Sequence, residues 1–242
     1  MRSLQTVAAL LLAIGTGTAV GYGLSGLSEQ AASSAPAKSS PASAALPKDV
    51  YPESGFRLPF VKRENLDAYG KQVYDSLADP NRRGSLAGLQ GPTGIRLHSP
   101  KVAELSGKLN ELLRFDTGLE GSLRELAILV TAREMNSQFE WTAHEPAAQK
   151  EGLEQRIIDI VKYRRSATGL GEKQTVIIEF GRQLFGLKKV TPETFARALK
   201  LFGPQGLVNL VSLMTNYSST ASLLAAFDMQ LLPGQKPLLP MP

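Results

Sequence analysis

The chain of 242 residues contains no cysteine, one tryptophan and only two histidines. Without cysteine it has no disulfide, and no thiolate for redox or covalent catalysis. The two histidines, His98 and His144, are far apart in the sequence, so the usual zinc-ligand sets are excluded and we expect no metal. No glycine-rich phosphate-binding motif sits between a strand and a helix. We therefore expect a protein that works without a cofactor.

The charge balance gives no sign of a nucleic-acid surface. The 27 basic and 22 acidic residues leave a formal net charge of +5. The basic residues are scattered, with no long Lys/Arg run and no interleaved aromatic residues. This pattern predicts solubility and some attraction for small anionic molecules, and no nucleic-acid partner.

The N-terminus has the pattern of an export signal. Arg2 precedes an apolar run over residues 7–14 and a stretch of small residues over 15–19. Because residues 3–28 carry no charge, an uncleaved membrane anchor is the alternative to a signal peptide over 1–27. Residues 28–57, rich in Ala, Ser and Pro, are predicted to form a disordered linker. We expect an exported protein, periplasmic or secreted, that contacts a membrane only if this segment is uncleaved.

The rest of the chain is predicted to be all-α. Apolar residues recur at helical spacing over 58–233, and no convincing β-alternation is found; an extended tail follows over 234–242. The helix at 122–135 is apolar almost all round and should be the long, buried centre of a helical bundle. Residues 81–97 contain four glycines and Pro92, which predicts a long loop over a pocket. The expected helices span 65–78, 99–115, 122–135, 137–151, 154–163, 172–185, 191–203 and 205–227.

The candidate catalytic group is a Glu-Trp-x-x-His motif. Glu140 and His144 are four residues apart, so on a helix their side chains share one face. Ser137 joins the same face two turns earlier. A carboxylate beside an imidazole can fix its tautomer, which suits proton transfer near neutral pH. The pattern predicts that His144, held by Glu140, is an acid/base catalyst, with Glu125 on the preceding helix as a second acid/base or orienting group.

Both carboxylates also have a structural interpretation. Ser122-x-x-Glu125 and Ser137-x-x-Glu140 each fit a capping box, in which the glutamate bonds to the start of its own helix. The two interpretations differ in burial, because a cap is exposed at a helix end whereas a site carboxylate is partly buried.

Four further residues are candidates for binding a substrate. Trp141 is either a core anchor or a wall for a flat substrate. Arg133, on the expected central helix, needs a partner: a substrate carboxylate, Glu140, or Glu134 of a neighbouring subunit. His98 precedes a helix start and is a possible second site group, and Ser137 is the fourth candidate.

The sequence resembles the carboxymuconolactone decarboxylase family, whose relatives include the AhpD-type alkylhydroperoxidases. The resemblance is carried by L-R-E-L-A-I-L-V-T-A-R and E-W-T-A-H-E-P-A-A-Q-K-E-G-L, with flanking L-H-S-P, L-R-F and F-G-P-Q-G-L-V-N-L-V, and covers about residues 58–233. It implies an AhpD-like helical bundle that assembles into a homo-oligomer, a trimer or a hexamer, with sites near subunit contacts.

The resemblance also bears on the reaction. In the peroxidase branch a Cys-x-x-Cys pair precedes the histidine, and its two positions fall on Ser137 and Glu140 here, with the family glutamate at Glu125. Serine and glutamate cannot cycle through a disulfide, so AhpD-type peroxidase activity is disfavoured. The decarboxylase branch carries the Glu-Trp-x-x-His form. It implies cofactor-free decarboxylation, isomerisation or lactone chemistry on a small anionic organic substrate. An exported, non-catalytic binding or assembly protein that has kept the fold is the alternative.

Overall fold

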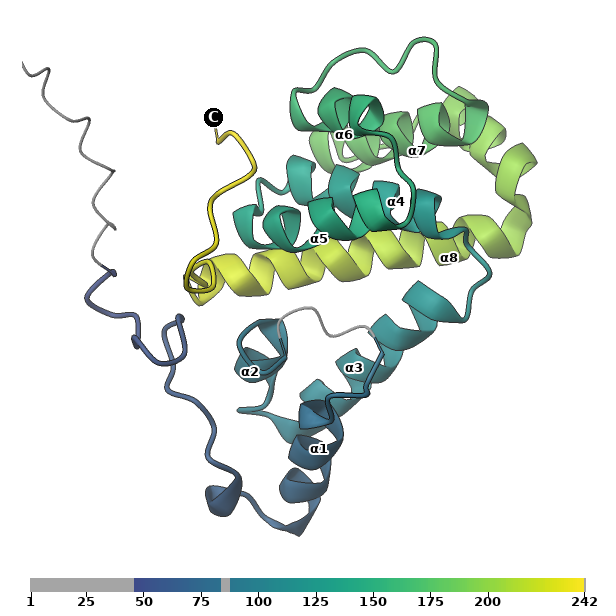
Figure 1. Cartoon of the computed structure of the whole chain (residues 1–242). Helices are drawn as coiled ribbons and strands as arrows, with labels where there is room; N and C mark the ends of the chain where they lie inside the picture. The colour runs from purple at the N-terminus through teal and green to yellow at the C-terminus, as the bar shows by residue number, and fades with distance from the viewer. Residues whose placement is uncertain (1–45, 84–87, 242) are drawn as a thin grey trace, which may run out of the picture. The chain divides into compact units, whose positions relative to one another are not determined.

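The computed structural model describes residues 46–83 and 88–241. The predicted signal or anchor over 1–27 and the linker up to residue 45 lie outside the described residues. The described part is all-α, as predicted, with one isolated β-bridge between Tyr51 and Phe56 (Figure 1). Within that part, no helix is both long and apolar enough to cross a membrane. The helices are α1 (Ala68–Ala78), α2 (Pro92–Arg96), α3 (Pro100–Phe115), α4 (Gly121–Glu134), α5 (Gln138–Lys150), α6 (Gln155–Lys162), α7 (Glu172–Arg182) and α8 (Pro192–Ala226), with a 3₁₀ turn at Arg63–Asn65 and a π turn at Gln183–Leu187.

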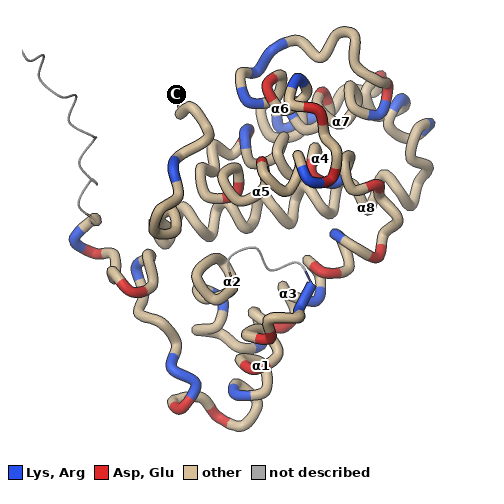
Figure 2. The backbone as a smooth tube through the Cα atoms, in the orientation of Figure 1, with Lys and Arg blue, Asp and Glu red and all other residues tan. Residues whose placement is uncertain are grey.

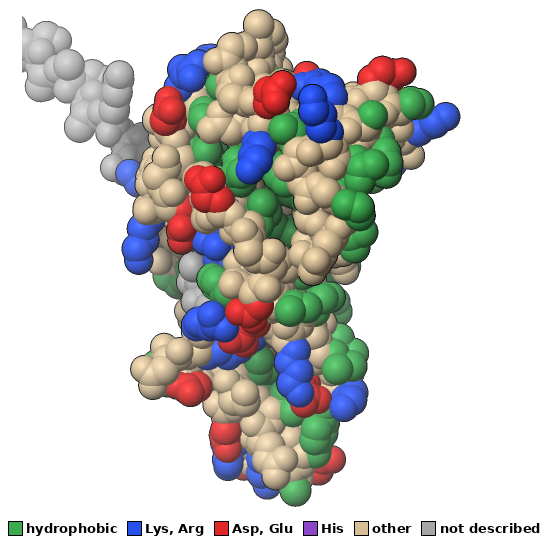
Figure 3. All heavy atoms as spheres, turned by 90° about the vertical axis from the view of Figure 1, so that its right-hand side faces the viewer, with side chains coloured by type: hydrophobic (Ala, Val, Ile, Leu, Met, Phe, Trp, Pro, Cys, Tyr) green, Lys and Arg blue, Asp and Glu red, His purple; other side chains and the backbone are tan. Residues whose placement is uncertain are grey.

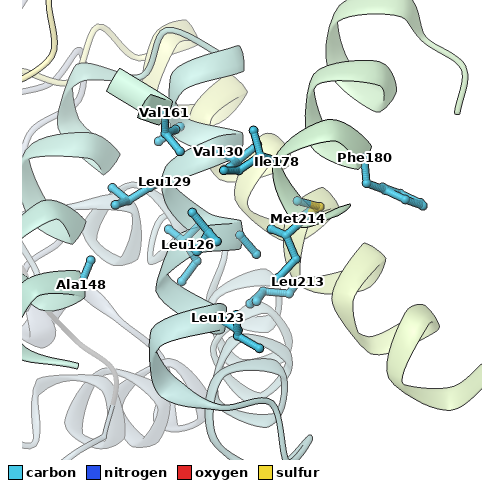
Figure 4. Packing of buried hydrophobic residues seen from close by; sticks show 14 of the residues in the cluster. Leu123, Leu126, Leu129, Val130, Ala148, Val161, Ile178, Phe180, Leu213 and Met214 are labelled. Carbon is cyan, nitrogen blue, oxygen red and sulfur yellow. The ribbon is translucent and has the colours of Figure 1, made fainter. Parts of the chain in front are cut away.

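Helix α4 is the buried centre of the bundle, as its composition predicted. All its residues from 123 to 133 are buried, and α5, α7 and α8 pack around it (Figure 1). A helix covered on every side can be apolar all round, which explains why α4 shows no amphipathic pattern. Figure 4 shows part of the resulting core, which includes Leu126, Leu129, Val130, Ile178 and Met214.

Helix α8 joins two expected helices across a break. Gly203 has φ 67° inside it and is followed by Pro204, so the predicted boundary at 203–205 is present as a kink. Proline cannot donate the next helical hydrogen bond, and glycine accepts the left-handed backbone at no steric cost. The part of α8 after the kink contacts α4 and α5 on one side and α2 and α3 on the other (Figure 1).

Three expectations about the loops and ends are corrected. Residues 81–97 are not all loop, because Pro92 begins the short helix α2. The linker ends before residue 57, since Val50 and Phe56 are buried. Asn65 does not cap α1; the Asp67 carboxylate does, accepting a hydrogen bond from the backbone N–H of Gly70.

The C-terminal tail packs on its own chain. Leu239 is buried in the same core as α4, and the carbonyl of Pro240 accepts a hydrogen bond from Arg133 at 2.8 Å. The tail therefore covers the C-terminal end of α4.

Helix α3 exposes an apolar stripe. Val102, Leu105, Leu109 and Leu112 are each about half exposed, while the buried residues of α3 are Ala103, Leu113 and Arg114. Hydrophobic side chains also reach the surface on the side shown in Figure 3. Acidic and basic residues are interspersed along much of the described chain, and the part of α8 after the kink carries neither (Figure 2).

Candidate active site

The site is built around His144 on α5, and Glu125 from α4 is its close partner. Glu125 Oε2 lies 2.7 Å from His144 Nδ1, while Glu140 Oε2 lies 3.5 Å from His144 Nε2. The predicted convergence of the three side chains is confirmed. The predicted division of roles is wrong, because Glu125 rather than Glu140 holds the imidazole. A separation of 3.5 Å is too long for a strong hydrogen bond, whereas 2.7 Å is typical of a charge-assisted one.

Two arginines hold the other oxygen of Glu125. Arg114 Nη2 is 3.3 Å and Arg124 Nε 3.4 Å from Oε1, and all three side chains are buried. Burial by itself raises the pKa of Glu125. The hydrogen bond with His144 and the charges of His144, Arg114 and Arg124 outweigh it, and they lower the pKa to about 2. Glu125 is therefore ionised at neutral pH.

An ionised Glu125 fixes the tautomer of the neutral imidazole. A carboxylate can only accept, so His144 Nδ1 must donate the proton in the 2.7 Å hydrogen bond. When the ring is neutral, the second nitrogen, Nε2, carries the lone pair and lies on the side of Glu140. A histidine oriented in this way can take up and return a proton at Nε2.

Glu140 has the opposite environment. It is 4 % exposed, and burial raises its pKa, although His144, Arg96 and Arg114 pull the pKa down. One carboxylate of the pair is thus held ionised and the other is biased toward its protonated form. Carboxyl groups whose pKa values are driven apart by their surroundings are typical of acid/base sites.

Neither glutamate is a helix cap. Glu125 is fully buried, and the N-cap of α4 is Glu120, whose carboxylate accepts a hydrogen bond from Ser122. Ser137 is the N-cap of α5, but its side chain makes no capping hydrogen bond. The capping-box interpretation is therefore wrong for both motifs.

Glu140 and His144 line a small cavity of about 80 Å³ between α2, α3, α5 and α8. Tyr217 of α8 packs the edge of its ring against His144, with centroids 5.0 Å apart and planes at 88°. Burial raises the pKa of Tyr217, so its hydroxyl stays protonated. Arg96 enters from α2 and donates a hydrogen bond to Thr220 Oγ1 at 2.8 Å. The loop predicted to cover a pocket thus supplies part of the cavity wall, including Pro92, Thr93 and Arg96.

Arg96 lines the cavity, and Arg114 and Arg124 support it, but none of these three arginines was a predicted site residue. Arg124 precedes Glu125 directly and is indistinguishable in sequence from a solvated charge. Arg96 lay in a segment expected to be loop. The one feature that could have marked Arg96 in the sequence is its position two residues after Gly94, the last glycine of that segment.

Trp141 and Arg133, both predicted to bind substrate, lie outside the cavity. Trp141 is fully buried in the core and donates from Nε1 to Glu145 Oε2 at 2.5 Å, and Glu145 also accepts from Lys162. Of the two interpretations of Trp141, the structure therefore supports the core anchor. Arg133 binds the carbonyl of Pro240 in the C-terminal tail.

His98 and Ser137 are not in the cavity wall either. His98 is exposed, and its Nε2 lies 3.0 Å from the carbonyl oxygen of Pro59. Ser137 is at the start of α5, two turns from His144. Helical spacing placed it on the correct face but too far along the axis to reach the cavity.

Within the described residues, no group of three or more His, Asp or Glu side chains has the arrangement of a metal site. The chain matches no family model, and no curated protein sequence is significantly similar to it. The geometry therefore provides the argument for function: a buried, oriented imidazole, a second carboxyl group biased toward protonation, and an arginine beside one small cavity.

Proposed function

We propose that the protein is a cofactor-free acid/base enzyme that acts on a small carboxylated substrate by decarboxylation, isomerisation or lactone chemistry. The observation that carries the proposal is the buried Glu125–His144 hydrogen bond beside Glu140 in a cavity. The resemblance to the decarboxylase branch of the carboxymuconolactone decarboxylase family supports the same class of reaction.

Each side chain has a role in this chemistry. His144 Nε2 takes a proton from the substrate or returns one to it, while Glu125 stabilises the charged imidazole through Nδ1. Glu140, when protonated, donates to the carbon or oxygen on which negative charge develops. In a decarboxylation the breaking C–C bond leaves its electron pair on the substrate, and this proton neutralises it.

The test is turnover of γ-carboxymuconolactone and related carboxylated lactones by the purified protein, followed by NMR of substrate and product. Turnover of at least one lactone is expected. A folded protein that turns over none of them would contradict the proposal and favour the non-catalytic alternative. Robust turnover of peroxides instead would favour the peroxidase alternative.

Arg96 is expected to bind the substrate carboxylate. Its guanidinium lines the cavity with one hydrogen bond, to Thr220, and forms no ion pair with any residue of the described part. Because a hydrogen bond to a charged group contributes about 1.5–3 kcal/mol, Arg96→Gln should raise KM roughly 10- to 100-fold and change kcat less. Steady-state kinetics check this, with exposed Arg156→Gln on α6 as the control. An unchanged KM would exclude Arg96 from substrate binding.

We also propose that the protein forms a homo-oligomer through α3. The half-exposed stripe of Val102, Leu105, Leu109 and Leu112 supports this, because contiguous apolar surface of this kind marks interaction sites. Introducing Leu105→Glu and Leu109→Glu together should convert the expected trimer or hexamer into monomers in light scattering after gel filtration. Leu187→Glu, on the exposed π turn, is the matched control. An assembly that survives the double substitution would place the interface elsewhere.

A further inference from the structure

The cavity beside His144 is small. It measures about 80 Å³, whereas an engineered cavity of about 150 Å³ holds benzene. A second hollow of about 320 Å³ lies between α1 and α3. The two hollows share two wall residues, Arg82 and Gly107.

Arg82 and Gly107 form the partition between them. A Cβ atom placed on Gly107 would lie 2.7 Å from Arg82 Nη2, closer than real Cβ atoms come to other atoms. The guanidinium of Arg82 thus occupies space that any other residue at position 107 would fill. Its side chain makes no hydrogen bond or ion pair with any residue that the structure describes. It is therefore free to move.

The outer hollow has an apolar base and a charged rim. Val73 and Leu77, both buried, line its base, and Glu104, Lys108 and Glu111 are among its other lining residues. Glu111 has an exposed ion pair with Arg83, at 3.4 Å. Glu104 already pairs with Lys101 and Lys108, and Glu111 pairs with Arg83, so an Arg82 side chain turned outward would join a rim of mixed charge.

We propose that the two hollows are one substrate site, in which an apolar chain attached to the carboxylate passes over Gly107 and binds on Val73 and Leu77. The carboxylate end stays beside Arg96 and His144, and Arg82 turns outward to let the chain pass. The substrate class is then a monocarboxylate with an apolar chain of several carbons. This inference rests on the proposed function, because it extends the same site.

The two histidines make the inference measurable without turnover. His144 lines the cavity, whereas His98 is exposed and lines neither hollow, so the imidazole resonance of His98 serves as an internal reference in NMR. Straight-chain carboxylates from butyrate to decanoate are the probes. We expect the His144 resonance to shift with all of them, and the Kd to fall about threefold per added methylene beyond hexanoate as the chain enters the outer hollow.

Two substitutions at the partition separate this site from non-specific binding. Gly107→Val fills the passage and should abolish the gain in affinity with chain length, measured relative to butyrate binding by the same variant. Valine is more favourable than glycine within a helix, so α3 should fold. Arg82→Ala opens the passage, so decanoate should bind at least as tightly as to the wild type. Leu187→Val, on the exposed π turn and outside both hollows, is the control.

The outcomes of these binding experiments distinguish a failure of this inference from a failure of the proposed function. If butyrate shifts His144 but decanoate binds no more tightly, the outer hollow is not a subsite and the acid/base proposal is unaffected. If the chain-length gain survives Gly107→Val, the chain lies elsewhere and the inference is wrong. If no carboxylate shifts the His144 resonance, both the extended site and the carboxylate-binding cavity are contradicted.

Discussion

Replacing His144 with alanine is expected to lower kcat by a factor of about 10²–10⁴, the usual contribution of a positioned acid/base group. The side chain is 3 % exposed and is the one imidazole that both lines the cavity and is oriented by an ionised carboxylate. No other described residue of the cavity combines these properties. The loss should appear in kcat and in kcat/KM together, because proton transfer occurs in the transition state.

The control for this prediction is the second histidine. His98→Ala removes an exposed ring that contacts the carbonyl of Pro59, so turnover should stay within a factor of two or so. Circular dichroism should show that the His144→Ala protein is folded, since Glu125 keeps its contacts with Arg114 and Arg124. A folded His144→Ala protein with wild-type turnover would remove His144 from the mechanism.

The sequence predicted the fold well because its signals are local. Ser99-Pro100, Gly152 and Gly203-Pro204 mark where helices begin, end or break, and these boundaries are found close to where they were expected. The run of apolar residues in the middle of α4, from 126 to 130, was enough to place that helix at the centre. The short helix α2 was not predicted, because Gly91 and Gly94 indicate a loop and a single helical turn is too short to show apolar periodicity.

The site was predicted less completely than the fold, because contacts between different helices determine its geometry. The spacing of Glu140 and His144 placed them on one face correctly, but intrahelical spacing does not say which ring nitrogen faces which carboxylate. That depends on how α4 packs on α5, which brings Glu125 to Nδ1 across 19 residues of sequence. The same limit applies to Arg133, whose hydrogen-bond partner Pro240 is distant in the chain.

The buried cluster of Glu125, Arg114 and Arg124 should also contribute strongly to the free energy of unfolding. Glu125→Ala would leave buried Arg114 and Arg124 without this carboxylate, and breaking a buried ion pair on one side costs about 3–5 kcal/mol of unfolding free energy. Urea denaturation at pH 7 measures this cost. Glu120→Gln, an exposed glutamate at the start of the same helix, should stay within about 0.5 kcal/mol of the wild type.

The pH dependence of stability should show the ionisation of Glu125 directly. Its pKa in the fold, about 2, is below the ordinary value of 4.5, so its contribution is fully present above about pH 4.5 and is lost as the pH falls toward 2. A shift of this size corresponds to about 3 kcal/mol at pH 7. Glu125→Gln keeps the shape but cannot ionise. The stability difference between wild type and this variant should therefore shrink steadily between pH 4.5 and 2. A difference that does not change with pH would mean that Glu125 is not held as the anion, and His144 would then lack the partner that orients its ring.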